Sequence, residues 1–183
     1  MSIRIHPKQI QYVVWQNRSF NFYLAARVLY HTRVYRAAAF NANLALELLL
    51  KATLLYHDPS FDPTRANHRF AGMLRTLRNK VPGGASAFIP GYFHHGQRYQ
   101  LLARYPSNGP GLLIPASFLA DLDGAFCALV KLVPFQHNTE LKRLLGSRDR
   151  MARLRLTRGN ASASALRRLL RVRVASPIGN DLP

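Results

Sequence analysis

The stretch from Tyr35 to Tyr56 constrains the fold more than any other part of this sequence. It contains neither Pro nor Gly, and its apolar residues recur at helical spacing. The main face consists of Ala38, Asn41, Ala42, Ala45, Leu48, Leu49, Ala52 and Leu55. The opposite side is apolar as well, at Phe40, Leu44 and Leu54. A helix that is apolar on nearly all sides lies centrally in a bundle or at an interface, so we expect a central helix and a two-fold homodimer that covers it.

Further helices are predicted on both sides of this stretch. Helical spacing predicts one from Phe20 to Arg33 and another from His68 to Lys80, which the run of Pro and Gly at 82–84 ends. A long helix is expected from Pro115 or Ala116 to Val133, and residues 87–104 hold at most a short one. The fold class is therefore all-α.

The boundaries of the domain follow from the composition. Residues 1–16 are predicted to form an irregular lead-in, and the helical domain is expected to span residues 17–146. Residues 147–183 form a basic C-terminal arm, whose apolar spacing fits a strand in one part and a helix in another. Both patterns suit an arm that is ordered only by a partner.

The chain carries a large excess of positive charge. It has 26 Lys and Arg residues against 8 Asp and Glu, which gives a formal net charge of +18. Residues 140–183 hold 11 basic and 3 acidic residues, or +8, and residues 1–139 carry the other +10. Such a surface is poorly suited to cationic partners and well suited to polyanions, so we expect RNA or a nucleotide as the ligand.

Other classes of protein are disfavoured by what the sequence lacks. The single cysteine, Cys127, excludes a disulfide framework and a cysteine-only metal cage. Glu47 and Lys51 interrupt the most apolar stretch, and the N-terminus lacks the apolar core of a signal peptide. His94 and His95 are adjacent, with no further ligand at metal spacing. We therefore expect a cytoplasmic protein with no metal, no cofactor and no membrane contact.

Short motifs in the predicted helices resemble those of HEPN domains. Residues 46–52 contain Glu47 and Lys51 followed by Ala52, which is similar to the Glu-x-x-x-Lys-Ala signature of the family. Residues 23–27 resemble the aromatic and Ala-Arg pattern of its first helix, and His68 is similar to a histidine that begins its third helix. Residues 103–106, which contain Arg104 and Tyr105, precede the last long helix as in the family. The resemblance covers residues 17–133.

This resemblance implies an antiparallel four-helix domain, usually dimeric, that binds nucleotides or RNA. Many members cleave RNA without a metal, and those ribonucleases carry an Arg and a His separated by four to six residues. Here the nearest arrangements are Arg65 to His68, with two residues between, and Arg27 to His31, with three. Cleavage of this kind needs a base for the 2′-hydroxyl and a cation near the scissile phosphate. The different spacing points against catalysis and leaves the expected fold unchanged.

Two sets of residues are candidates for a functional site. Glu47 and Lys51, four apart on one helix, form a stabilising pair or line a polar site. His68 with Arg27 or Arg104 is the catalytic set if the chain is a ribonuclease. The remaining candidates for binding are cationic or aromatic residues suited to phosphate contact and base stacking, namely Arg65, Arg98, Tyr99, Tyr105, Arg153, Arg155, Arg167 and Arg171.

The sequence thus predicts an RNA- or nucleotide-binding HEPN-like protein without a recognisable ribonuclease Arg-His pair. One alternative is a metal-independent ribonuclease, of toxin or defence type, with a rearranged site. That site would use His68 or His31 together with Arg65, Arg27 or Arg104. The other alternative is an interaction subunit whose basic tail docks an acidic protein partner and binds no nucleic acid.

Overall fold

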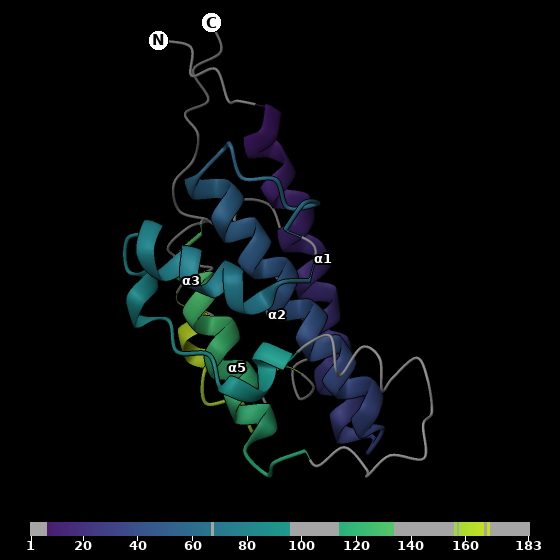
Figure 1. Cartoon of the computed structure of the whole chain (residues 1–183). Helices are drawn as coiled ribbons and strands as arrows, with labels where there is room; N and C mark the ends of the chain where they lie inside the picture. Colours follow the sequence, from purple (N-terminus) through teal and green to yellow (C-terminus); the bar gives the residue numbers. More distant parts are fainter. Residues whose placement is uncertain are drawn as a thin grey trace, which may run out of the picture.

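In the part of the chain that it describes, the computed structural model consists of helices joined by turns and loops (Figure 1). The described residues are 7–66, 68–95, 114–133, 156, 158–166 and 168. In chain order the elements are α1 (Pro7–His31), α2 (Tyr35–His57), α3 (Phe70–Lys80), the 3-10 helices η1 (Gly84–Ser86) and η2 (Gly91–His95), and α5 (Phe118–Val130). No strand occurs among the described residues, which confirms the predicted all-α fold class.

The first helix, α1, begins earlier than the sequence predicted. Pro7 lies at its start, where a fixed φ and a missing N–H suit a helix. The predicted irregular lead-in over residues 1–16 is therefore wrong from residue 7 onward. The reason is packing: Tyr12 is buried, and its ring meets that of Tyr56 in α2 edge-on, with 5.1 Å between the ring centroids. Residues 1–6 lie outside the described part of the chain.

The helices α1 and α2 form an antiparallel hairpin. Residues 32–34 join them in a tight turn, in which Arg33 adopts a left-handed conformation with a φ of 63°. The N–H of Val34 donates a hydrogen bond of 2.8 Å to the carbonyl of Leu29, which closes the turn. Because the turn is so short, the two helices lie side by side (Figure 1).

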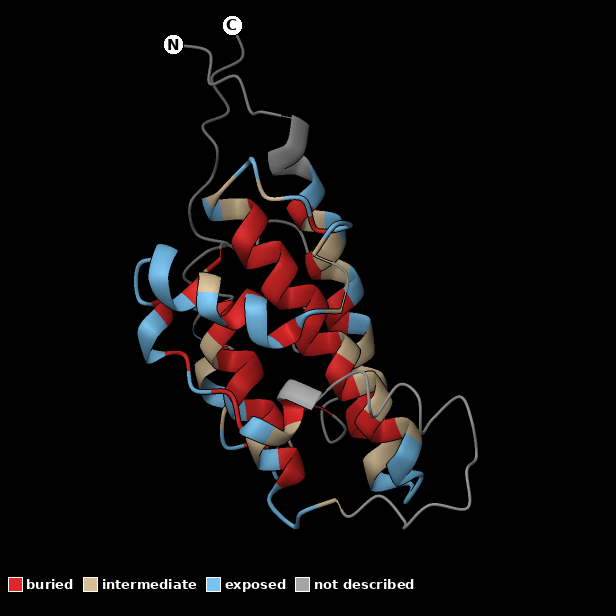
Figure 2. Cartoon of the chain, viewed as in Figure 1, coloured by how far each residue is buried: buried red, intermediate tan, exposed pale blue. Residues whose placement is uncertain are grey.

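The helix α2 is central in the fold, as its composition predicted. It begins at Tyr35 and ends one residue beyond the predicted end, and most of its length is buried beneath α1, α3 and α5 (Figure 2). Leu54 is buried, while Phe40 and Leu44 are half-buried. The chain itself thus covers most of α2, so the apolar character of this helix no longer requires a second copy. The homodimer stays a prediction.

By length and composition alone, α2 is also able to cross a membrane. Its most apolar window has a mean hydropathy of 1.3, and 83% of that window is buried inside the fold. A helix in the core of a protein has the same length and apolar composition, so this feature is weak evidence for a membrane span.

The third helix, α3, begins at Phe70, two residues after the predicted start, and ends at Lys80 as expected. Its buried face consists of Phe70, Met73, Leu74 and Leu77. The chain then reverses at Gly83, which has a φ of 75°, and at Gly84, where an added Cβ would lie 2.2 Å from the carbonyl oxygen of Leu77. Only glycine fits so close to α3.

The last described long helix, α5, lies within its predicted range. Its buried face includes Leu119, Leu122, Phe126, Leu129 and Val130, and those five side chains complete the core beside α2. Of the short helix expected within residues 87–104, the described part contains η2, and residues 96–113 lie outside the description.

Part of the C-terminal region packs onto the helices. We refer to its described residues, 156, 158–166 and 168, as the docked C-terminal segment. Leu156 and Leu166 are buried in the hydrophobic core, and Ala163 is buried as well. The prediction that everything beyond residue 146 is an arm ordered only by a partner is therefore wrong for this segment. The physical reason is that the chain's own helices bury the apolar side chains of this segment, so no partner is needed to order it.

Candidate functional site

The structure brings together three of the residues that the sequence predicted for a site. Glu47 and Lys51 lie on α2, and His68 lies between α2 and α3. The Nδ1 atom of His68 is 3.0 Å from each carboxylate oxygen of Glu47, and the Nζ atom of Lys51 is 2.8 Å from Oε1 of the same carboxylate. Glu47 therefore contacts a cation on its own helix and an imidazole from the next segment of the chain.

The three side chains of this cluster differ in their access to solvent. The side chains of Glu47 and Lys51 are only 5% and 6% exposed, whereas that of His68 is 41% exposed. Trp15 of α1 covers Lys51, whose Nζ atom lies 5.4 Å from the centre of the Trp15 rings in a cation–π contact. The cluster is thus a buried ion pair with the imidazole of His68 as its outer member.

The contact with Glu47 determines which nitrogen of His68 is available. An ionised carboxylate only accepts hydrogen bonds, so Nδ1 donates its proton to Glu47. In the neutral ring, Nε2 is then the unprotonated nitrogen. A carboxylate that orients an imidazole in this way is the arrangement that prepares a histidine to act as a general base. Lys51 compensates the charge of Glu47, so that the cluster gathers no net negative charge that would repel a phosphate.

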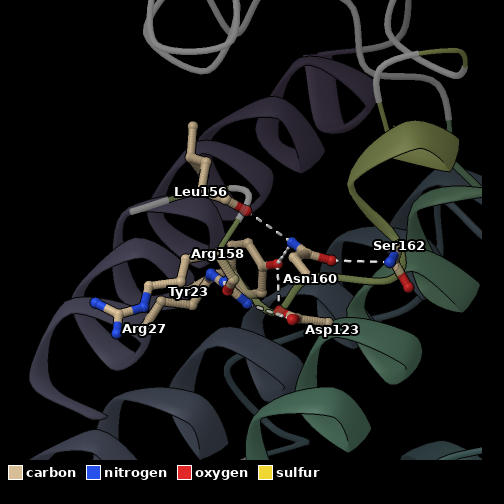
Figure 3. A network of polar contacts seen from close by, with 7 residues as sticks. All are labelled: Tyr23, Arg27, Asp123, Leu156, Arg158, Asn160 and Ser162. Atoms are coloured by element: carbon tan, nitrogen blue, oxygen red, sulfur yellow. Dashed lines mark hydrogen bonds and ion pairs between the residues drawn. The ribbon is translucent and has the colours of Figure 1, made fainter. Parts of the chain in front are cut away.

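A second polar cluster, inside the protein, contains the predicted catalytic residue Arg27 (Figure 3). The side chain of Arg27 on α1 is fully buried and pairs with Asp123 on α5. Asp123 also accepts a hydrogen bond of 2.6 Å from the hydroxyl of Tyr23. A second guanidinium nitrogen of Arg27 donates to the carbonyl oxygen of Arg158 in the docked C-terminal segment, at 2.6 Å. The prediction that Arg27 joins His68 at a phosphate is therefore wrong, because Arg27 is enclosed and already engaged.

Asn160 completes this second cluster. Its Nδ2 atom donates to the hydroxyl of Tyr23 at 3.0 Å and to the carbonyl of Leu156 at 2.9 Å (Figure 3). The ring of Tyr23 stacks on Phe126, with ring centroids 4.1 Å apart. Burial raises the pKa of the Asp123 carboxyl, and Arg27 and the hydrogen bonds offset part of that rise. Burial, and then the neighbouring Asp123, raises the pKa of the Tyr23 hydroxyl as well. This cluster joins α1, α5 and the docked C-terminal segment.

Most of this enclosed cluster was not predicted from the sequence, although one signal was present. Asp123 follows Leu122 and shares the inward face of its predicted helix with Leu119 and Phe126. A carboxylate on a buried face requires a cationic or hydrogen-bonding partner. The identity of the partner was not predictable, because Arg27 lies 96 residues earlier in the chain. The contact of Trp15 with Lys51 was not predicted, because residues 1–16 were expected to be irregular.

The other predicted site residues are either elsewhere on the surface or outside the described residues. Arg65 is 90% exposed and pairs with Asp62 at 3.4 Å rather than joining Glu47 and His68. His31, the alternative base, lies at the end of α1, near Arg158 and the enclosed cluster. The residues outside the description are Arg98, Tyr99, Arg104, Tyr105, Arg153, Arg155, Arg167 and Arg171. Within the described ranges, no group of three His, Cys, Asp or Glu side chains is placed to hold a metal ion.

Comparison with known proteins supports the resemblance noted in the sequence. The model of the HEPN domain family matches residues 12–111, which is more than half of the chain. No curated protein and no solved structure matches. The protein belongs to the HEPN domain family, which includes ribonucleases and nucleotide-binding members. The match begins at residue 12, within α1, and covers α2 and α3 with the Glu47, Lys51 and His68 cluster. It ends before α5 and the docked C-terminal segment.

Proposed function

We propose that this HEPN protein binds RNA or a nucleotide through phosphate contacts at its basic surface. The observation that carries the proposal is the shortage of carboxylates around its exposed arginines. Eight exposed arginines have no carboxylate partner among the described residues: Arg18, Arg33, Arg36, Arg69, Arg75, Arg78, Arg158 and Arg168. Arginine is always charged and matches phosphate oxygens with two parallel hydrogen bonds. The phosphate groups of RNA or of a nucleotide supply the anionic partners that these exposed arginines lack.

The distribution of the acidic side chains strengthens this argument. Glu47 and Asp123 are buried and already paired with Lys51 and Arg27, so they offset none of the exposed positive charge. Two exposed ion pairs are found in the described part of the chain, and the longer of them joins Lys80 to Asp58 at 3.8 Å. A surface of one sign concentrates counter-ions of the other and attracts a polyanion from a distance.

The experiment is a salt titration of binding to a short fluorescent single-stranded RNA. Affinity should fall linearly with salt on logarithmic axes between about 0.05 and 0.2 M, because each phosphate contact releases condensed counter-ions. A mononucleotide added as competitor separates RNA from nucleotide binding, and an acidic polypeptide tests the alternative of an acidic protein partner. Binding that is absent at low salt would rule out the proposal, and binding that does not change with salt would point to apolar docking instead.

A second candidate function, metal-independent RNA cleavage, is favoured by the contact between Glu47 and His68. In this scheme Nε2 of His68 removes the proton of a ribose 2′-hydroxyl, and the 2′-oxygen attacks the adjacent phosphorus. The bond from phosphorus to the 5′-oxygen breaks, and the imidazolium returns the proton to that leaving oxygen. The products are a 2′,3′-cyclic phosphate and a 5′-hydroxyl. Of the three arginines predicted to supply the cation, Arg27 is enclosed and Arg104 is outside the described residues. The third, Arg65, is exposed and pairs with Asp62, so it must leave that carboxylate to contact the phosphate.

Cleavage is tested separately from binding. His68→Ala should abolish cleavage and leave RNA bound, and Glu47→Gln should lower the rate by less, because a carboxamide still accepts the Nδ1 proton. DNA of the same sequence, which lacks every 2′-hydroxyl, is the matched substrate that should stay intact while its phosphates still bind. If wild-type protein binds RNA and never cleaves it, the cleavage function is wrong and the binding function is retained. If His68→Ala cleaves as fast as wild type, the site lies elsewhere.

A further inference from the structure

We propose that a groove along the outer face of α3 holds the phosphate backbone of an RNA strand, with Arg75, Arg78 and Asn79 as the binding residues. The inference rests on the proposed RNA binding and names a location for it. These three residues lie outside the Glu47, Lys51 and His68 cluster, and none of them belongs to the motifs that resemble the family.

The groove is a feature of one side of α3. It is a hollow of about 220 Å³ lined by Ala71, Leu74, Arg75, Arg78 and Asn79. These positions are three or four residues apart along the helix and therefore share one face. Of these lining residues Leu74 is buried, whereas the other four are exposed.

The charge of the groove is uncompensated. The helix α3 contains no acidic residue, and neither Arg75 nor Arg78 has a carboxylate partner among the described residues. The partial negative charge at the end of a helix favours a cation in its last turn, which accounts for Arg78 and Lys80. It does not account for Arg75, which lies one turn earlier. Two guanidinium groups one turn apart therefore face the same hollow without an anion between them.

The size and chemistry of the groove indicate its ligand. Its volume is below the 300–1,000 Å³ typical of pockets for whole small molecules, so it suits a phosphate group and part of a sugar. Each guanidinium presents a planar fork of donors that matches phosphate oxygens. The Asn79 amide both donates and accepts, so its carbonyl oxygen is able to take a hydrogen bond from a ribose 2′-hydroxyl. Neither DNA nor an acidic peptide offers that group, and for this reason we assign the groove to RNA.

The test compares two double variants that remove the same charge. Arg75→Gln with Arg78→Gln removes both cations from the groove. Arg18→Gln with Arg36→Gln, on α1 and α2, lowers the charge of the basic surface by the same amount outside the groove, so it measures the loss of long-range attraction alone. All four side chains are exposed and have no carboxylate partner among the described residues. The substitutions are therefore expected to leave the fold intact, which far-UV circular dichroism and thermal melting verify.

The groove variant should lose two phosphate contacts. For single-stranded RNA each contact contributes about 0.7 to the slope of log affinity against log salt, so the slope should flatten by about 1.4. At about 0.1 M salt this corresponds to a loss of affinity of about 25-fold, whereas the control variant should lose much less. Asn79→Leu should narrow the difference in affinity between RNA and DNA of the same sequence.

The outcomes separate failure of this inference from failure of the proposed function. If wild-type protein does not bind RNA, both are wrong. If wild type binds and the groove variant keeps its affinity and slope, or if both double variants lose affinity equally, the groove is not the site while RNA binding stands. If an acidic polypeptide competes with RNA in wild type and not in the groove variant, the groove takes carboxylates and the assignment to RNA is overturned.

Discussion

The two buried ion pairs of this protein are similar in composition and differ in their surroundings. Arg27 and Asp123 lie inside the protein, where Tyr23, Asn160 and the carbonyl of Arg158 complete their hydrogen bonds. Glu47 and Lys51 are almost as deeply buried, yet Glu47 also contacts a histidine that reaches solvent. The first pair connects three separate parts of the chain, and the second connects the core to the surface.

This difference shows what each pair does for the molecule. A buried ion pair seldom stabilises a fold more than apolar residues of similar volume would, because removing both charges from water is costly. The enclosed pair instead fixes the relative positions of α1, α5 and the docked C-terminal segment. The outer pair holds an imidazole in one orientation at the surface. We therefore expect changes in the enclosed pair to lower stability more than changes in the outer pair, and the proposed second function, RNA cleavage, to depend on the outer pair alone.

The largest expected effect is that of Asp123→Ala. This substitution leaves the fully buried guanidinium of Arg27 without its anion and should lower the free energy of unfolding by about 3–5 kcal/mol. Urea denaturation followed by far-UV circular dichroism measures the change. Asp123→Asn, which keeps an acceptor for Tyr23 and Arg27, should cost less. Equal stability of Asp123→Ala and wild type would show that the enclosed pair is not formed in solution.

The next effect concerns the docked C-terminal segment. Leu166 is buried, so Leu166→Ala should lower the free energy of unfolding by about 2–3 kcal/mol through lost apolar contacts and the remaining cavity. Arg168→Ala, two residues on and exposed, is the matched control and should change stability by less than about 0.5 kcal/mol. If both substitutions have the same small effect, the segment does not unfold together with the helices, and the boundary predicted near residue 146 is correct after all.

Much of the fold was predictable from the sequence, and the exceptions have physical reasons. The helix α2 was predicted to within one residue because it has no Pro or Gly and its apolar pattern is continuous. The beginning of α1 and the docked C-terminal segment were missed, because contacts with distant parts of the chain hold them. Tyr12 packs on Tyr56, and Asn160 bonds to Tyr23, which lies 137 residues away. The spacing of apolar residues within one segment does not indicate which distant segment it contacts.

The candidate site was predictable to a similar degree. The spacing of Glu47 and Lys51 indicated a pair on one side of a helix, and the structure contains that pair. The choice of His68 came from the family resemblance, whereas its contact with Glu47 follows from the path of the chain between α2 and α3. The groove on α3 was not predicted, because Arg75 and Arg78 are ordinary exposed residues in the sequence. Only the structure shows that they face one hollow above Leu74.

A smaller effect on stability is expected at the outer pair. Glu47→Gln removes the charge that faces Lys51 and His68 and should lower the free energy of unfolding by about 1–3 kcal/mol, because the buried Lys51 keeps only a neutral partner. The loss should be smaller than that of Asp123→Ala, since His68 is exposed and water is able to approach the cluster. Urea denaturation of Glu47→Gln and Asp123→Ala under the same conditions shows which variant loses more stability. A larger loss in Glu47→Gln would contradict the distinction between an enclosed and an outer pair.

The smallest expected effect is a change in how stability depends on pH near the enclosed pair. Partial burial of the ring, and then the charges of Arg27 and Arg158, lower the pKa of His31 below its ordinary value of 6.5. As the pH falls through 6.5, the unfolded chain therefore binds a proton at His31 before the folded chain does. The stability contributed by neutral His31 is present above that pH and is lost as the pH falls through the lower pKa of the folded state. Urea midpoints measured between about pH 7 and 5 should fall less steeply for His31→Gln than for wild type, while Thr32→Ala, an exposed neighbour that does not titrate, should keep the wild-type slope. An unchanged slope in His31→Gln would mean that neither burial nor the charges of Arg27 and Arg158 lower the pKa of His31 in the folded protein.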